Sequence, residues 1–338
     1  MKFTEMGISV IICTYTEERW DDLLAAVESV RKQSLPASET IVVVDHNPVM
    51  FKRVRAEIPG VLATENHQVR GLSGARNSGI EAARGAIVAL LDDDATAAPD
   101  WLERLTAGFE DARVAVIGGA AEPLWVNGKP GWFPEEFNWV VGCSYRGMPE
   151  RTTPVRNPFG GNMAFRRQLY TAYGGFRTGV GRVGTWPVGC EETEFCIRIH
   201  QRQPHSLVLY EPMARIKHKV PGKRTTWRYF RARCYAEGWS KAQVARLAGA
   251  RDALATERQY TLRILPAGVL RGVVDAAVRR DASGLRRAGA IVAGLALTAA
   301  GYLTGTLSQS ARKVGERITA RLLWRRPTQL RREETPRG

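Results

Sequence analysis

The sequence is poor in the features that mark disulfide, zinc or secretory proteins. Its five cysteines are odd in number and include no Cys-x-x-Cys pair, so they indicate reduced thiols in a cytoplasmic protein. The first apolar run, residues 8–13, is too short for a secretory signal and is soon followed by Glu17 and Glu18. We therefore expect a cytoplasmic protein without a secretory leader, a disulfide framework or a zinc site.

Acidic residues are also scarce relative to basic ones. The 49 lysines and arginines outnumber the 34 aspartates and glutamates, which leaves a net charge of +15. Such an excess suits nucleic acid, an anionic membrane surface or an anionic substrate. From Arg312 to the end, nine basic residues stand against three glutamates, so this tail alone carries +6. The uneven distribution favours a surface-binding tail over a basic active site.

What the sequence does contain is a repeated alternation of apolar strands and amphipathic helices. Short aliphatic runs at 8–13, 41–44, 61–64, 86–91 and 114–117 predict strands, and the segments between them predict helices. This order predicts an α/β fold, in which a mostly parallel sheet with right-handed crossovers is flanked by helices. With 338 residues, the chain is long enough to bury a sizeable core.

Three aspartates, Asp92, Asp93 and Asp94, directly follow the strand predicted at 86–91. In open α/β sheets, ligands bind outside the carboxyl ends of the strands. Because side chains alternate along a strand, Asp92 and Asp94 share one face while Asp93 points away. Hard oxygen ligands favour Mg²⁺ or Mn²⁺, so the cluster predicts a divalent-metal site. The alternative is a solvated turn before Pro99.

Other polar residues follow the neighbouring strands. Thr14 comes after the first strand and Asp45 after the second, while residues 70–77 form a Gly-rich turn with Ser73 as the predicted cap of a helix. Such a turn can approach phosphates closely, although this one is neither Gly-x-Gly-x-x-Gly nor a P-loop. Taken singly, Asp45 is equally consistent with a helix cap and Arg76 with a solvated helix residue.

The second half of the predicted α/β region carries three further features. Residues 120–165 interleave prolines with tryptophans and phenylalanines, which predicts an irregular binding wall or lid, or else a loop packed on itself. The acidic run 191–194 begins a helix, where carboxylates either serve as a general base or simply favour the helix dipole. His218 lies in a last extended segment, 207–220, as a metal ligand or a packing residue.

Together, six segments resemble the motifs of family 2 glycosyltransferases with the GT-A fold. In chain order they are residues 9–15, 41–45, 71–79, 91–94, 160–167 and 191–194. The resemblance covers about two thirds of the chain. It implies a GT-A catalytic domain over residues 1–220, followed by a helical basic region over residues 221–338.

The resemblance also implies roles for single residues. Contacts to a nucleotide-sugar, a UDP-sugar in particular, are assigned to Thr14, Glu17, Asp45, Arg76 and Asp92. The divalent cation, Mg²⁺ or Mn²⁺, is assigned to Asp94, Asp92 and His218. The catalytic base is assigned to Glu192, which stands where the family has an aspartate, with Glu191 as the alternative. Acceptor contacts are assigned to Gly161, Asn162, Arg231 and Arg233.

The implied chemistry is a single inverting displacement on a nucleotide-diphosphate sugar. The metal neutralises the charge that grows as the diphosphate leaves. Glu192 removes the proton of an acceptor hydroxyl as that oxygen attacks the anomeric carbon. The acceptor is expected to be a lipid-linked or cell-envelope glycan.

Two other functions fit parts of the sequence less well. A sugar-nucleotide pyrophosphorylase needs a Gly- and Lys-rich triphosphate loop, whereas the first strand here leads into residues 14–18, Thr-Tyr-Thr-Glu-Glu. A basic nucleic-acid-binding protein needs base-stacking aromatics beside its positive tail. Because the tail instead follows an uncharged apolar run, we expect no nucleic acid among the partners.

The last third of the chain predicts a membrane-associating region. Leu262, Leu265, Val269, Val273 and Ala277 form an apolar stripe among arginines, as in helices that lie on a membrane. Residues 288–307 carry no charge, but basic residues flank both ends, which favours interfacial burial over a full crossing. We expect a peripheral or monotopic protein on the cytoplasmic side of an anionic membrane, with a buried soluble hairpin as the alternative.

Overall fold

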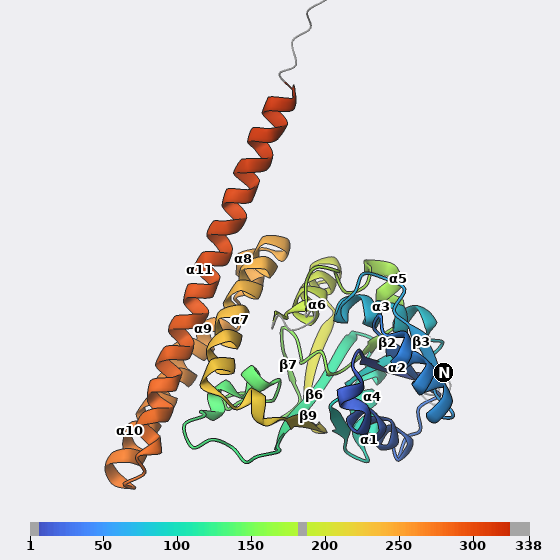
Figure 1. Ribbon diagram of the computed structural model, residues 1–338, viewed down its shortest axis with the longest axis horizontal. Coiled ribbons are helices and arrows are strands. Elements are labelled where there is room, and N and C mark those ends of the chain that lie inside the picture. The colour runs from blue at the N-terminus through green and yellow to red at the C-terminus, as the bar shows by residue number, and fades with distance from the viewer. Residues whose placement is uncertain (1–6, 182–187, 325–338) are drawn as a thin grey trace, which may run out of the picture.

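The computed structural model describes residues 7–181 and 188–324, which form a sheet with helices on both faces and a separate layer of C-terminal helices (Figure 1). The strands are β1 (Ile8–Thr14), β2 (Glu39–Val44), β3 (Leu62–Glu65), β4 (Ile87–Asp92), β5 (Ala95–Ala97), β6 (Val114–Trp125), β7 (Thr153–Pro154), β8 (Asn162–Arg166) and β9 (Leu207–Val220). The helices of the α/β part are α1 (Trp20–Arg31), α2 (Pro48–Glu57), α3 (Leu72–Ala82), α4 (Trp101–Ala107), α5 (Gln168–Tyr173) and α6 (Glu191–Arg202). Those of the C-terminal layer are α7 (Trp227–Ala248), α8 (Ala250–Ala253), α9 (Glu257–Gln259), α10 (Leu265–Val278) and α11 (Ser283–Trp324).

The sheet confirms the predicted α/β class and adds antiparallel strands to it. Among the described residues its order is β3-β2-β1-β4-β8-β6-β9-β5, with β7 paired to β9. The first four strands of this order are parallel, whereas β8 runs antiparallel between β4 and β6. The register of β1 places Cys13 opposite Asp92 and Thr14 opposite Val44. The polar residues that follow β1, β2 and β4 therefore meet at one edge, as the strand order predicts.

Both faces of the sheet are covered, which explains why its central strands are continuously apolar. Side chains of alternating residues enter two cores: Val10 and Ile12 pack toward α1, α2 and α4, whereas Ile11 packs toward α3, α5 and α6. These two cores hold the carboxyl edge of the sheet rigidly.

The prediction of an irregular segment from residue 120 is wrong at its start. β6 continues to Trp125 because it pairs with β9 along its whole length, with a register shift between Gly119 and Ala120. Glycines at 118 and 119 leave room for the neighbouring segments. A Cβ on Gly118 would lie 2.0 Å from Pro158, and one on Gly119 would lie 1.8 Å from the Ala214 carbonyl oxygen. The long-range pairing with β9 decides the conformation despite the proline and tryptophan in the strand.

The predicted helix cap at Ser73 is also wrong. The helix α3 begins at Leu72, and Gly71 is its N-cap with φ +127°, a conformation that favours glycine. The Ser73 hydroxyl instead donates a 2.6 Å hydrogen bond to the carbonyl of Val180. The helix starts two residues earlier than predicted, so Ser73 lies within it and ties α3 to the loop before α6.

The C-terminal layer is built on close contacts between helix backbones. A Cβ on Gly238 of α7 would lie 1.9 Å from the Thr298 carbonyl oxygen, and one on Gly301 of α11 would lie 2.0 Å from that of Tyr235. Between this layer and the sheet lies an aromatic core that contains Phe133, Phe137 and Phe230. The α7–α11 layer thus shares its core with the segment after β6.

The apolar stripe predicted to lie on a membrane is only partly exposed. Leu265 of α10 is buried and Val269 packs against the aromatic core, whereas Leu262 is 66% and Val273 43% exposed. Other exposed apolar side chains come from neighbouring positions that the stripe omitted: Leu270, Val274 and Val278 of α10, and Leu285, Val292, Leu303 and Leu307 of α11.

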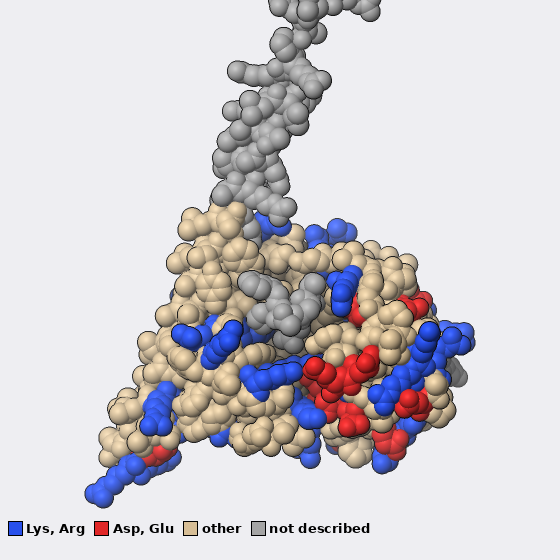
Figure 2. Space-filling view, viewed as in Figure 1, with Lys and Arg blue, Asp and Glu red and all other residues tan. Residues whose placement is uncertain are grey.

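One described helical segment, Ser283–Ser308 of α11, is long and apolar enough to cross a membrane, and only 28% of its most apolar stretch is buried. This low burial does not fit the alternative of a buried hairpin. Figure 2 shows a mostly uncharged surface along α11 and basic side chains at the tip of the α10–α11 hairpin. Residues 325–338, the end of the predicted basic tail, lie outside the described residues.

We expect Gly301→Val to lower the free energy of unfolding by about 3 kcal/mol, because the new side chain must push the α7 backbone away. Gly289→Ala is the matched control on α11, since nothing lies within 4 Å of its added Cβ. That variant should be neutral or up to about 1 kcal/mol more stable. Denaturant unfolding in detergent measures both; equal effects would contradict the close packing of α7 and α11.

Candidate active site

A cavity lies at the carboxyl edge of the sheet, between the strand ends, the start of α6 and the first turns of α7. Its lining includes Thr14, Arg19, Asp45, Arg76, Asp92, Asp93, Asp94, Gly161, Asn162, Glu191, Glu192, His218, Arg224, Tyr229 and Arg233. The fold therefore brings most of the residues singled out in the sequence to one place. Residues of the C-terminal layer complete the wall opposite the sheet.

The acidic cluster and His218 form a compact set of potential metal ligands. One ligand atom from each of Asp92, Asp94 and His218 lies within 4.8 Å of the others. His218 Nε2 is 3.2 Å from Asp94 Oδ1 because β9 pairs with β5, which places His218 opposite Ala95. Two carboxylate oxygens and an imidazole nitrogen are a donor set that suits Mn²⁺ and other divalent cations.

Cations surround the Asp94 carboxylate. Arg19 and Arg224 each place a guanidinium nitrogen 3.3 Å from Asp94 Oδ2. Burial alone would raise the pKa of Asp94, but His218, Arg224 and Arg19 hold that pKa well below its usual range. Burial acts to lower the pKa of His218, but the Asp94 carboxylate raises it to about 10. A metal that binds here must displace the His218 proton.

Asp93 is not part of the set of potential metal ligands, and it lies with Asp94 in the turn that follows β4. Its Oδ1 accepts a 2.6 Å hydrogen bond from Arg19. Burial raises the pKa of Asp93 to about 6, with Arg19 opposing the shift and Asp94 adding to it. Sequence reasoning missed Arg19 and Arg224, because no spacing pattern relates either of them to residues 92–94.

Arg76 lies buried between two acidic groups of the site. Its Nη1 is 2.8 Å from Glu191 Oε1, and its Nη2 is 3.6 Å from Asp92 Oδ1. Gly160 and Gly161 make room for these partners: a Cβ on Gly160 would lie 2.7 Å from Arg76, and one on Gly161 would lie 2.1 Å from Asp92. Arg76 therefore connects the start of α6 to the metal-ligand set.

The two neighbouring glutamates of α6 differ in their surroundings. Glu191 is buried and paired with Arg76, whereas Glu192 is half-buried and has no ion pair among the described residues. Burial and the neighbouring Glu191 carboxylate raise the pKa of Glu192 to about 8. A carboxylate with such a pKa is basic enough to accept a proton near neutral pH.

The remaining sequence-predicted residues occupy different places. Asp45 accepts hydrogen bonds from Asn66 Nδ2 and the Gly71 backbone amide at 2.6 and 3.0 Å, at the rim of the cavity. Glu17 is exposed outside the cavity lining and accepts a 3.3 Å hydrogen bond from Asn47. Asn162 is fully buried and bonded to Trp101, Ala120 and Ala214. Arg231 is exposed and lies outside the lining, while Arg233 is part of it.

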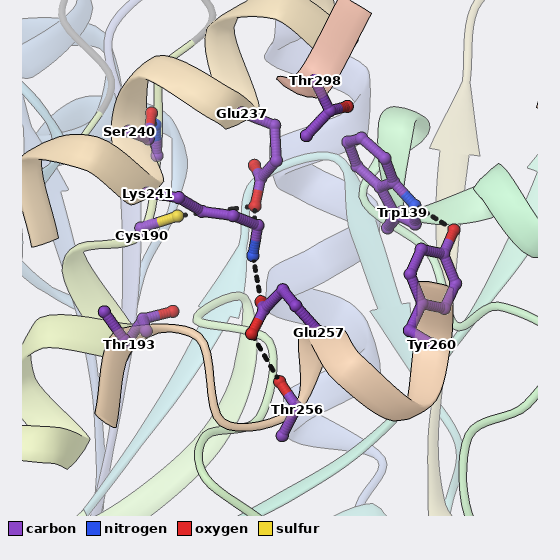
Figure 3. A network of polar contacts seen from close by, with 12 residues as sticks. Trp139, Cys190, Thr193, Glu237, Ser240, Lys241, Thr256, Glu257, Tyr260 and Thr298 are labelled. Carbon is purple, nitrogen blue, oxygen red and sulfur yellow. Dashed lines mark hydrogen bonds and ion pairs between the residues drawn. The ribbon is translucent and has the colours of Figure 1, made fainter. Parts of the chain in front are cut away.

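A half-buried polar network joins α7 to the start of α6 behind the cavity (Figure 3). Arg233 Nη1 donates a 2.8 Å hydrogen bond to Glu237, which also lies 3.3 Å from Lys241. Lys241 pairs in turn with Glu257, whose other partner is Arg156 at 2.9 Å. Burial opposes the shift, but Arg233 and Lys241 lower the pKa of Glu237 to about 2.

The network also touches the residues that precede the two glutamates. Cys190 is the N-cap of α6 with φ +73°, and its thiol donates to Glu237 at 3.5 Å. The Gly189 amide donates to the Ser240 hydroxyl at 3.1 Å. These contacts to α7 therefore fix where the first turn of α6 lies.

A mixed sheet that presents the Asp92 and Asp94 pair and two neighbouring glutamates beside a cavity is the arrangement of a nucleotide-sugar-dependent glycosyltransferase of the GT-A fold. The sequence profile described as Glycosyl transferase family 2 matches residues 9–174. The chain belongs to this family.

Three known proteins illustrate the similarity. The glucosyl-dolichyl phosphate glucuronosyltransferase of Haloferax volcanii is 41% identical over 240 residues, which cover 70% of this chain and 76% of that protein. The mannosyltransferase PcManGT of Pyrobaculum calidifontis, solved with GDP-Man and Mn²⁺, has a TM-score of 0.54 at 20% identity and 86% coverage of both chains. GalNAc-T7, solved with UDP, GalNAc and Mn²⁺, has a TM-score of 0.50 at 17% identity, covering 77% of this chain and 56% of that one.

We expect Glu192 to make the protein less stable as the pH rises. Its pKa of about 8 in the folded protein exceeds the ordinary value of 4.5, so between these values the folded protein keeps a proton that the unfolded chain releases. Stability due to this group is therefore lost as the pH rises through this window. Glu192→Gln should match the wild type near pH 5 and unfold at a higher temperature than the wild type at pH 8.

Glu191→Gln is the matched control for this measurement of thermal unfolding. It removes the closest partner of the buried Arg76, which should cost about 3–5 kcal/mol at pH 5, where Glu192 is protonated in the folded protein. Parallel pH profiles of the wild type and Glu192→Gln would contradict the raised pKa of Glu192.

Proposed function

We propose that this enzyme transfers glucuronic acid from a UDP-sugar to the glucose of a lipid-linked glucosyl phosphate, with inversion at the anomeric carbon. The observation that carries the proposal is the 41% identity to a glucosyl-dolichyl phosphate glucuronosyltransferase across 70% of the chain. The cavity supplies the chemistry that such a reaction needs: ligands for a divalent cation, a carboxylate base and a cation on the acceptor side.

The donor side is formed by the ends of β1, β2 and β4. Thr14, Asp45 and Arg76 line the nucleoside pocket in this proposal, and the Asp45 carboxylate is kept in place by the Gly71 amide. Asp94, His218 and Asp92 would hold Mg²⁺ or Mn²⁺, which fits their donor set. The bound cation supplies neutralisation of the diphosphate leaving group.

Glu192 is the catalytic base of the proposed reaction. Its raised pKa and the absence of an ion partner among the described residues leave it able to take the proton of an acceptor hydroxyl. Glu191 is held by Arg76 and acts as a positioning residue for the start of α6. The acceptor oxygen attacks the anomeric carbon and the nucleoside diphosphate leaves, so no covalent enzyme intermediate forms.

Arg233 is the contact for the phosphate of the acceptor. The half-buried network behind it contains three cations, Arg156, Arg233 and Lys241, and two anions, Glu237 and Glu257, which leaves one net positive charge. A net charge that is partly removed from water costs free energy unless an opposite charge compensates it. An anionic acceptor that enters the cavity beside Arg233 provides that compensation.

We propose that the enzyme lies on the cytoplasmic side of the cell membrane and that the C-terminal layer holds it there. The exposed apolar side chains of α10 and α11 and the arginines around them supply apolar burial and attraction to anionic lipid, the two contributions that a stable anchor requires. A monotopic or peripheral position brings the cavity to its lipid-linked acceptor.

The decisive experiment incubates the detergent-solubilised enzyme with UDP-glucuronate and dolichyl phosphate glucose in the presence of Mn²⁺. We expect a glucuronosyl-glucosyl lipid, identified by mass spectrometry, and loss of the product when the metal is chelated. Glu192→Gln should lower kcat by roughly a hundredfold or more with little change in donor KM.

Asp94→Asn is the control for the metal, and it should lose metal-dependent nucleotide binding while remaining folded by circular dichroism. If Glu191→Gln showed the loss of kcat and Glu192→Gln stayed active, the assignment of the base would be reversed. Absence of transfer with this pair, but transfer with another nucleotide-sugar or acceptor, would overturn the proposed substrates.

For the acceptor phosphate, we expect Arg233→Gln to raise the KM of the phosphate-bearing acceptor at least tenfold, because a charge-assisted contact is lost. A neutral alkyl glucoside should be used equally by the wild type and this variant, which separates phosphate recognition from a merely structural role. Arg231→Gln, on the exposed side of the same helix, is the matched control and should leave both KM values unchanged. An equal loss with both acceptors would contradict the assignment.

A further inference from the structure

A second concave surface lies outside the catalytic cavity, between α11, the N-terminal end of α7 and the loop after β6. This groove is lined by Trp132, Trp227, Arg286, Gly289, Ala290 and Ala293, and its volume is about 370 Å³. Ligand pockets generally measure roughly 300–1,000 Å³ and are mostly apolar. The groove therefore has the size and the lining of a binding site for an apolar group.

Gly289 keeps the groove open, and nothing in helix packing explains its presence. The other glycines of α11 that the structure describes stand at close contacts, where a Cβ would lie within 3 Å of another group: Gly284, Gly294, Gly301 and Gly305. At Gly289 nothing lies within 4 Å of an added Cβ. A glycine inside a helix costs about 1 kcal/mol relative to alanine. At Gly289 no close contact accounts for this cost, and the missing side chain leaves open space in the groove beside Trp132 and Trp227.

The walls of the groove are formed before any ligand binds. Trp132 makes edge contacts with Trp227 and Phe230 at centroid distances of 5.2 and 5.5 Å. Trp227 in turn stacks on Phe230 at 5.2 Å with an interplanar angle of 11°. The aromatic core holds these rings in place. A ligand can therefore enter the groove without disrupting contacts between the rings.

The charge at the rim indicates an amphiphilic environment. Arg286 is exposed and has no ion pair among the residues that the structure describes, whereas the adjacent Arg287 is bound to Asp275 and Asp281. A long cationic side chain beside apolar surface reaches toward lipid head groups while its stem stays apolar. Exposed Leu285 and Val292 continue the apolar surface along α11 on either side.

The groove and the cavity lie on different faces of the same end of α7. At 3.6 residues per turn, Trp227 and Arg233 are separated by roughly 120° around the helix and about 9 Å along it. We propose that the groove binds the isoprenoid chain of the acceptor whose phosphate meets Arg233, an inference that rests on the proposed function. A chain that leaves the cavity then passes around the N-terminal end of α7 and lies in the groove over Gly289, against Trp132 and Trp227.

The test compares Gly289→Phe with Val292→Phe. The first adds a ring inside the groove, where nothing lies within 4 Å of the added Cβ, and the second adds the same ring at a position of α11 that is 58% exposed and is not part of the groove lining. We expect Gly289→Phe to raise the KM of dolichyl phosphate glucose at least tenfold. Transfer to glucosyl methyl phosphate, which has no chain that could enter the groove, should be unchanged. Val292→Phe should behave as the wild type with both acceptors.

Two outcomes of these kinetics overturn the proposal. One is an unchanged KM for the long-chain acceptor in Gly289→Phe, and the other is an equal loss with both acceptors. A change in oligomeric state of Gly289→Phe in size-exclusion chromatography with light scattering would assign the groove to a second copy of the chain, which also overturns it.

A direct binding measurement separates this proposal from the proposed reaction. If the wild type transfers to neither acceptor, the proposed function fails, but binding of radiolabelled dolichyl phosphate in detergent still tests the groove. The wild type and Val292→Phe should bind it equally, and Gly289→Phe at least tenfold more weakly. Equal binding by all three proteins, or equal competition by phosphatidylglycerol, would overturn the assignment to an isoprenoid chain.

Discussion

The site depends on the compensation of buried negative charge at the carboxyl edge of the sheet. Three consecutive aspartates lie at the end of β4, where the surrounding segments exclude much of the water. Each carboxylate pairs with a cation from a distant part of the chain. Arg19 comes from the turn after β1, Arg224 from the segment after β9, and Arg76 from the middle of α3. Unpaired, these carboxylates would be protonated or would destabilise the fold. Their partners therefore also fix how the surrounding segments meet.

This compensation leaves one carboxylate of the site without an ion partner. Arg76 neutralises Glu191, and the repulsion from Glu191 together with burial raises the pKa of Glu192 to about 8. A charge that the fold does not compensate costs stability, and a reactive group commonly carries such a cost. The arrangement explains how two adjacent glutamates on the same helix acquire opposite properties.

The C-terminal helices belong to the site as much as to the membrane-facing surface. Glu237 and Ser240 of α7 bond to Cys190 and Gly189 before the first turn of α6 (Figure 3), and the aromatic core joins the same helix to the segment after β6. Glycines on α7 and α11 allow their backbones to approach closely, which makes the layer a rigid wall. A change in the C-terminal layer is therefore transmitted to the cavity through direct packing.

The sequence predicts the α/β class, the main strands and the elements that carry Asp92, Asp94, Glu192 and His218, because hydrophobic periodicity and the polar residues at strand ends are local signals. The sequence predicts neither the extension of β6 to Trp125 nor the position of Ser73 inside α3, since the pairing with β9 and the hydrogen bond to Val180 are long-range. It left Glu191 and Glu192 as alternatives, and only the fold distinguishes their surroundings, through an arginine 115 positions away. Arg19, Arg224 and the groove at Gly289 carry no local pattern. Their roles become visible in the folded protein, because charge compensation and shape arise between segments that are distant in the chain.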